Sequence, residues 1–462
     1  MDDSARRVPA NRIRSPRPLI PWRVASGRGA TEQPNACGDG EAHLSLVFWA
    51  MVVVTGVLSG LFGIALMMLL FAVERIAFGA APGHFTDAVI RADGHHRVLT
   101  LVLAGVIAGV GWFLLRRYTQ GQRAEIDNAL WSNDSTLSFP RSLGTSVLSE
   151  VVVGMGASLG REAAPKLMGG VCGSLLARWT GLTAAQQRLL VACGGGAGLA
   201  AVYNVPLGGT LLAAEVLYGS VQLPVVLPAL ACSWIATAVS WLYLPSEATY
   251  PRVPAYTFQG VELGWALIAG PVIGLLAVGF VRLIAWVSHW KPSGWLSIVA
   301  PVFAFTVLGI IGVWLPELFG NGHGIAENAF EGSTGILLLL AFGLLKPLVT
   351  AMCLGSGASG GLFTPTLSIG AAVGGVLGAA WSLVWPQAPI GVYAMIGAAA
   401  MIGAGMQAPL AGLALVLELT HGGFGLMVPM IAATVLATAV ARYLDGYSIY
   451  SARLPAGVRG PD

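Results

Sequence analysis

The residues of this chain that could do chemistry follow two copies of a Gly-Ala-Ser sequence. The first copy begins GASLGREAAPKLMGG at Gly156, and the second begins GASGGLFTPTLSIGA at Gly357. Each copy runs through glycine to a proline five residues later, as GREAAP at 160–165 and GGLFTP at 360–365. Glycine permits a sharp turn and proline is best tolerated in a first helical turn, so each copy predicts the start of a helix. Because a helix N-terminus offers unpaired N–H groups and a positive dipole end, two such starts predict an anion-binding site.

Glu162 is the sharpest candidate residue of the first copy. An ionised group at the centre of a bilayer costs about 2.5–3.5 kcal/mol on insertion scales, so a carboxylate there indicates function. Beside an anion site it could act as a gate, competing for the helix ends when ionised and moving away when protonated. The alternative is a structural ion pair with Arg161 or Lys166. Lys166 either attracts anions toward the pore or extends its amine to the membrane surface.

A second duplicated segment ends in a glutamate in each half of the chain. Residues 204–217 read NVPLGGTLLAAEVL and residues 407–419 read QAPLAGLALVLEL. Glu215 follows Pro206 by nine residues, and Glu418 follows Pro409 by the same interval. The matched positions predict a shared architectural role for the two glutamates, such as capping backbone groups.

The composition identifies the elements that must position these residues. Charged residues make up 10% of the chain and hydrophobic residues 55%, whereas a soluble domain carries about 25% charged residues. Most of the chain must therefore face lipid. Several apolar segments are shorter than the ~20 residues of a perpendicular span, which predicts broken helices that meet inside the protein. We expect an all-α polytopic membrane protein built from two inverted repeats with broken and tilted helices.

The predicted organisation has five parts. They are an Arg- and Pro-rich disordered tail at 1–42, a first membrane repeat at 43–245, a linker at 246–261, a second repeat at 262–446, and a final segment at 447–462. Seven arginines precede the first span, so the positive-inside rule predicts a cytoplasmic tail. The histidines are dispersed and the cysteines lack ligand spacing, so we expect no metal site.

The motifs together resemble those of the CLC family of chloride channels and chloride/proton exchangers, over residues 44–455. GREAAP is similar to the family's GREGP motif, GGLFTP to GGIFAP, and IYSARL at 449–454 to the segment that carries the pore tyrosine. The resemblance implies that Glu162 is the gating glutamate, that the backbone of Leu362 and Phe363 binds the anion, and that Tyr450 is the pore tyrosine. It also implies a homodimer with one independent pathway per subunit, of the prokaryotic type without cytoplasmic regulatory domains.

Three departures from the family pattern bear on function. Gly121 falls where the family has an anion-contacting serine, which leaves fluoride open as a substrate because fluoride-exporting relatives also lack that serine. Val216 aligns with the proton-transfer glutamate of the exchangers and cannot carry a proton, which favours uncoupled conduction. The glycine-proline pair after the gating glutamate is Ala163-Ala164 here, so the helix start could be displaced.

These observations predict a glutamate-gated CLC-type chloride channel in the cell membrane, multi-pass, with both termini in the cytoplasm. A proton-coupled chloride or fluoride antiporter is the alternative, and an intramembrane enzyme is a remote one. The expected partners are a small anion, the lipid bilayer and a second copy of the chain, with no cofactor and no nucleic acid. The predicted anion contacts are Gly160, Arg161, Ala163, Gly361, Leu362, Phe363, Tyr450 and Gly121.

Overall fold

The computed structural model describes residues 44–122, 125–130 and 135–454, and apart from one isolated bridge their regular secondary structure is helical. The predicted tail at 1–42 lies outside them. Seven helical segments are long and apolar enough to cross a membrane, which makes the chain a multi-pass membrane protein. They are α1 (Leu46–Phe78), α3 (Gly94–Tyr118), α9 (Leu223–Ser240), α10 (Val261–His289), α13 (Ile336–Gly355), α14 (Phe363–Ser382) and Phe424–Leu444, whose main part is α17 (Met427–Leu444).

The remaining helices are shorter, and several begin or end inside the protein as the sequence predicts. They are α2 (Phe85–Arg91), α4 (Ile126–Leu130), α5 (Phe139–Gly154), α6 (Ala163–Trp179), α7 (Ala184–Tyr203), α8 (Pro206–Leu211), α11 (Leu296–Ile311), α12 (His323–Glu331), α15 (Ile390–Met406) and α16 (Pro409–Thr420). A π-helical turn, Leu212–Tyr218, continues α8. Short 3-10 turns cover Pro316–Leu318, Phe424–Leu426 and Ser451–Arg453.

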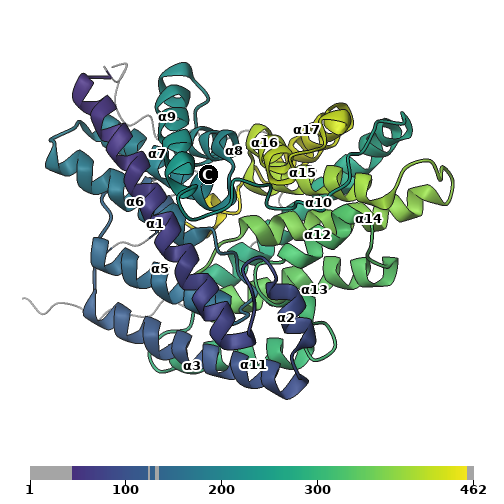
Figure 1. Ribbon diagram of the computed structural model, residues 1–462, viewed down its shortest axis with the longest axis horizontal. Coiled ribbons are helices and arrows are strands. Elements are labelled where there is room, and N and C mark those ends of the chain that lie inside the picture. The colour runs from purple at the N-terminus through teal and green to yellow at the C-terminus, as the bar shows by residue number, and fades with distance from the viewer. Residues whose placement is uncertain (1–43, 123–124, 131–134, 455–462) are drawn as a thin grey trace, which may run out of the picture.

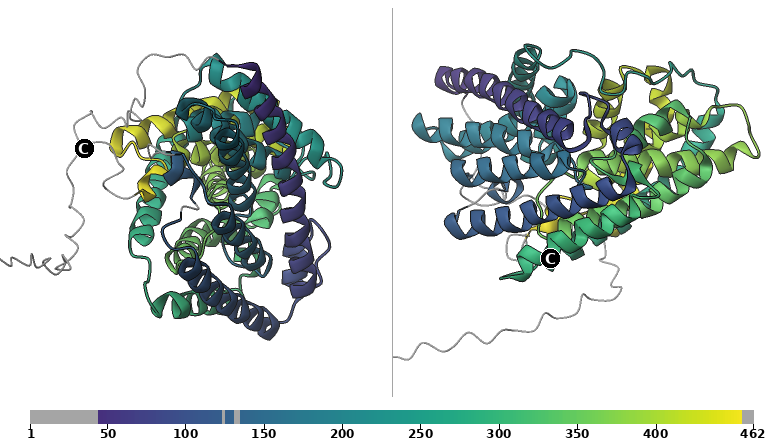
Figure 2. Two further views of the ribbon diagram at one scale, coloured as in Figure 1. Left: turned by 90° about the vertical axis from the view of Figure 1, so that its left-hand side faces the viewer. Right: turned by 60° about the horizontal axis from the view of Figure 1, so that its bottom comes forward.

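The two halves of the chain repeat one packing scheme. In the first half α6 packs on α7 and α1 on α9, and in the second α14 packs on α15 and α10 on α17. Figure 1 shows the first half mostly on the left and the second on the right, and the right-hand view of Figure 2 shows the same division. The halves are joined where α3 packs along α11 and where α8 meets α16. The all-α architecture with two repeats is therefore confirmed.

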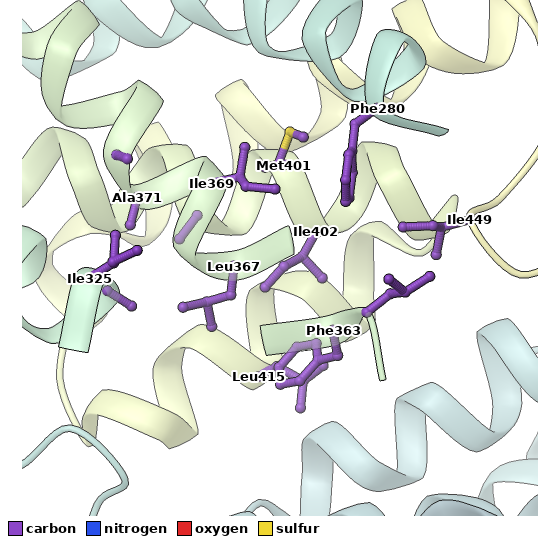
Figure 3. Packing of buried hydrophobic residues seen from close by; sticks show 14 of the residues in the cluster. Phe280, Ile325, Phe363, Leu367, Ile369, Ala371, Met401, Ile402, Leu415 and Ile449 are labelled. Atoms are coloured by element: carbon purple, nitrogen blue, oxygen red, sulfur yellow. The ribbon is translucent and has the colours of Figure 1, made fainter. Parts of the chain in front are cut away.

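Small residues let the central helices approach closely. A Cβ added to Gly169 of α6 would lie 2.0 Å from the carbonyl oxygen of Gly194 in α7. In the second half, a Cβ on Gly374 of α14 would lie 2.4 Å from the carbonyl oxygen of Tyr393 in α15. In lipid there is no hydrophobic driving force between helices, so their association depends on close van der Waals packing, which small residues allow. Figure 3 shows the larger side chains that complete this core, including Phe363 at the start of α14 and Ile402 of α15.

The duplicated glutamates cap each other's repeat element. Glu418 accepts hydrogen bonds from the backbone N–H groups of Leu207 (2.9 Å) and Gly208 (2.6 Å), in the first turn of α8. Glu215 accepts them from Leu410 (3.3 Å) and Ala411 (2.8 Å), in the first turn of α16. The predicted capping role is confirmed, and each cap is supplied by the other half of the chain.

Candidate anion-binding site

The two Gly-Ala-Ser copies meet at the start of α6 and α14. Gly160 donates its N–H to the carbonyl oxygen of Gly361 (2.8 Å), and Gly361 donates back to Gly160 (2.7 Å), which forms a single antiparallel bridge. α6 begins at Ala163 and α14 at Phe363, the fourth positions of GREAAP and GGLFTP. The two helix starts are therefore in register with each other.

The carboxylate of Glu162 lies over this bridge. A Cβ at Gly160 would come within 2.2 Å of the Glu162 carboxylate oxygens, and one at Gly361 within 2.0 Å of Oε1. Glycine is thus required at both positions so that the carboxylate can approach the backbone.

Glu162 is 2% exposed and accepts hydrogen bonds from the start of α14. The N–H of Phe363 donates to Oε1 (2.7 Å), and the Thr364 hydroxyl donates to Oε2 (3.2 Å). The Tyr203 hydroxyl lies 3.5 Å from Oε2 and 2.8 Å from Thr364 Oγ1. The carboxylate therefore occupies the position that a helix N-terminus offers to an anion.

The structural ion pair considered for Glu162 is not formed. Among the described residues, neither Arg161 nor Lys166 has a nitrogen within 4.0 Å of the Glu162 carboxylate. Arg161 turns away instead, with its guanidinium carbon 4.9 Å from the centroid of the Tyr203 ring and its Nε donating to the Tyr203 hydroxyl (3.4 Å).

A cavity of about 640 Å³ reaches Arg161 and Tyr203 from one face of the protein. We call it the Arg161 cavity. Its wall also carries Glu74 of α1, His323 of α12 and the linker residue Arg252. Because Tyr203 both lines the cavity and contacts Glu162, this tyrosine separates the cavity from the carboxylate.

Tyr450 lies beside the first turn of α6, next to Lys166, and is 7% exposed. The backbone before it is anchored to α15, since Ile449 donates its N–H to the carbonyl oxygen of Gly405 (2.8 Å). The Lys166 amine lies 4.1 Å from the Tyr450 ring centroid and 3.5 Å from Asp127 Oδ1. Lys166 is 7% exposed, so its amine points at the Tyr450 ring rather than extending to the membrane surface.

The structure does not bring Gly121 together with the other predicted anion contacts. Gly121 lies in an exposed turn after α3 with φ 74°, and an added Cβ would meet nothing within 4 Å. Further along, Glu125 lies 3.6 Å from Lys291. Partial burial works against ionisation of Glu125, but the charges of Lys291 and Arg453 outweigh it and hold the pKa of Glu125 below its ordinary value.

The other predicted residues take supporting positions. Leu362 is 1% exposed and precedes α14, where its carbonyl oxygen accepts from the Thr366 hydroxyl (2.6 Å). Val216 lies half-buried in the π-helical turn and packs against the main core. Its apolar side chain offers no group that could hold a proton.

Tyr203 and Thr364 contact Glu162 in the structure, and the sequence reasoning missed both. Thr364 stands within GGLFTP as the one hydroxyl between apolar residues and proline, and Tyr203 is the one aromatic hydroxyl at the end of a small-residue helix. Both signals are present in the sequence. Their convergence on Glu162 depends on how α7 and α14 pack, which the sequence pattern alone does not predict.

Comparisons with known proteins agree with this geometry. The family model for the voltage gated chloride channel matches residues 103–442, so the chain belongs to this family. A curated relative, the H(+)/Cl(-) exchange transporter ClcA of Salmonella schwarzengrund (strain CVM19633), is 28% identical over 434 residues, covering 88% of each chain.

Solved structures share the fold. A slow cyanobacterial Cl-/H+ antiporter matches with a TM-score of 0.77 and 23% identity, covering 88% of this chain and 97% of the other. A CLC-type fluoride/proton antiporter matches with a TM-score of 0.70 and 21% identity, again over 88% of this chain and 97% of the other. The chain is therefore similar to anion/proton antiporters both in sequence and in fold.

Proposed function

We propose that this protein exchanges chloride for protons across the membrane. The observation that carries the proposal is the hydrogen bond from the Phe363 N–H to Glu162 Oε1 (2.7 Å). The carboxylate holds the position that the start of α14 offers to an anion, so carboxylate and chloride compete for one site. The curated relatives named as H(+)/Cl(-) exchange transporters support this reading over the channel predicted from the sequence.

The exchange follows from the two protonation states of one side chain. As a carboxylate, Glu162 accepts from Phe363 and Thr364 and excludes chloride from the start of α14. Once protonated it carries no charge to compete with chloride, which binds the freed N–H groups in its place. Return of the carboxylate expels the anion and releases the proton. Tyr203 and Arg161, at the end of the cavity, guide the anion toward or away from this position.

A second candidate is uncoupled conduction, which Val216 favours. A valine in the π-helical turn cannot carry a proton, so the structure provides no carboxylate at the position that the family resemblance assigns to proton transfer. In this alternative Glu162 acts only as a gate.

Liposomes that contain the purified protein distinguish the two functions. An outward chloride gradient should drive proton uptake against a proton gradient, recorded with a pH electrode beside a chloride electrode. Chloride release that needs only a potassium ionophore, with no proton movement, would overturn the exchanger and establish the channel. Fluoride release without chloride release would show that the protein transports fluoride instead, in keeping with glycine rather than serine at position 121.

We also propose that the protein lies in the cell membrane with both termini in the cytoplasm. The arginine-rich start of the sequence supports a cytoplasmic N-terminus in the cell membrane by the positive-inside rule. The C-terminus would lie on the same side. The family resemblance supports a homodimer whose subunits transport independently, and cross-linking in membranes followed by flux assays of mixed dimers would test this arrangement.

A further inference from the structure

Glu150 of α5 is a buried carboxyl group that the site described above does not use. It is 0% exposed, and neither of its oxygens has a hydrogen-bond partner among the described residues. Burying an isolated ionised carboxylate costs far more than burying a neutral, protonated carboxyl group. An intramembrane acid without a structural partner therefore requires a functional explanation.

Glu150 lies at the level of Glu162 because α5 and α6 run antiparallel. Near the start of α5, Leu137 donates its N–H to Ser174 Oγ (3.1 Å), and nine residues later Ser146 Oγ donates to the carbonyl oxygen of Ala164 (3.4 Å). One further turn along α5 brings Glu150 level with the residues that precede α6. In agreement, the charges that act on the Glu150 carboxyl are those of Arg161, Glu162 and Glu74.

A row of buried hydroxyl groups leads along α5 to Glu150. Ser142, Ser146 and Ser149 share one face of the helix and are at most 1% exposed. Ser142 Oγ and Ser149 Oγ have no hydrogen-bond partner in the described part of the chain. From Ser142 to Glu150 the helix rises about 12 Å. Hydroxyl groups can both accept and donate protons, and of the three only Ser146 has its hydroxyl in a hydrogen bond of the described residues, the one to Ala164.

The start of this row lies on the face opposite the Arg161 cavity. Ser138, which caps α5, donates to the side chain of Gln122 (2.5 Å), in the turn that follows α3. The other end of α3 follows α2, whose first residues line the Arg161 cavity. The hydroxyl row therefore approaches Glu150 from the side that the cavity does not reach.

We propose that Glu150 supplies protons to Glu162 from the face opposite the Arg161 cavity, in the place of the carboxylate that Val216 lacks. In this step the O–H bond of the Glu150 carboxyl breaks and an O–H bond forms on a Glu162 oxygen. Glu150 is left as a carboxylate, stabilised by the positive charge of Arg161. A proton that travels along the α5 hydroxyl row then restores the Glu150 carboxyl. This inference rests on the proposed exchange function.

Paired chloride and proton fluxes from liposomes holding the full-length protein test the proposal. Glu150→Gln keeps the shape of the side chain but cannot carry a proton. We expect its chloride-driven proton uptake to fall at least tenfold while chloride flux stays within about twofold of wild type. Glu150→Asp, which restores a titratable group, should recover part of the proton flux.

The hydroxyl row has a matched control. Ser149→Ala should lower proton uptake several-fold without changing chloride flux. Ser233→Ala should change neither, because it alters an equally buried hydroxyl of α9 that also lacks a hydrogen-bond partner in the described part of the chain. Wild-type coupling in Glu150→Gln would overturn the proposal, and so would loss of both fluxes in both Glu150 variants. Absence of proton uptake in the wild-type protein would instead refute the exchange function itself.

Discussion

Replacing Glu162 with glutamine tests how strongly the carboxylate competes with chloride. The wild-type carboxylate accepts the Phe363 N–H at 2.7 Å. A hydrogen bond to a charged group contributes about 1.5–3 kcal/mol net, and one between neutral groups about 0.5–1.5 kcal/mol. Glutamine therefore weakens this competitor by roughly 1–1.5 kcal/mol, and 1.4 kcal/mol corresponds to a tenfold change in an equilibrium. We expect chloride to gain about tenfold in access to the start of α14.

The assay is chloride efflux from liposomes across acid and neutral pH. In the wild type, acid protonates Glu162 and removes its charge, so flux should rise as pH falls. Glu162→Gln should give the higher flux at neutral pH and a flat pH profile, with no chloride-driven proton uptake. Asp93→Asn makes the same charge change at a side chain that is 74% exposed, and it should keep the wild-type profile. A Glu162→Gln protein whose flux still rises with acid to the wild-type extent would refute the assignment of Glu162 as the competing group.

Three further perturbations follow from the geometry. Gly361→Ala would bring a methyl group within 2.0 Å of Glu162 Oε1, so we expect the carboxylate to be displaced and the pH dependence of flux to be lost. Gly279→Ala, whose Cβ meets nothing within 4 Å, is the control, and equal pH profiles in the two variants would contradict this reasoning. Lys346→Met would leave two buried carbonyl oxygens without their donor, at a cost of about 1–3 kcal/mol each; an unchanged thermal midpoint in detergent would show that they find other donors. The pKa of Glu125 is held below its ordinary value of 4.5 in the folded protein. The ionised side chain therefore stabilises the folded protein at any pH above 4.5, and this stabilisation is lost as the pH falls through the lowered pKa. The midpoint temperature of unfolding should therefore fall less on acidification in Glu125→Gln than in the wild type. An identical fall in both proteins would exclude this contribution.

Much of the fold could be predicted because duplication is visible in the sequence itself. The equal nine-residue intervals to Glu215 and Glu418 predicted two matched elements, and the structure shows their carboxylates capping α16 and α8. The glycine-to-proline motifs predicted helix starts inside the protein, and α6 and α14 begin within them. Both signals lie within short stretches of the sequence, so they can be recognised without knowing the fold.

The rest of the site depends on contacts between residues that are distant in the sequence. Tyr203 reaches Glu162 from 41 residues away, and Thr364 reaches it from 202 away. Glu150 stands in a serine-containing helix whose sequence gives no sign that its carboxyl has no hydrogen-bond partner among the residues that the structure describes. Lys166 could not be assigned from the sequence because its position depends on Asp127 and Tyr450, which other segments bring to it.

The exchanged glutamate caps bear on how this chain could have arisen. Each cap satisfies backbone groups of the opposite half, so a half-length protein folding alone would expose one helix start and one acid without partners. A pair of identical half-length chains facing in opposite directions would satisfy both with a single glutamate, used twice. Fusing the two copies would preserve these bonds, and afterwards the acid of one half and the helix start of the other could change only together. Expressed as separate polypeptides, the two halves should therefore be recovered as a complex, with neither persisting in the membrane on its own.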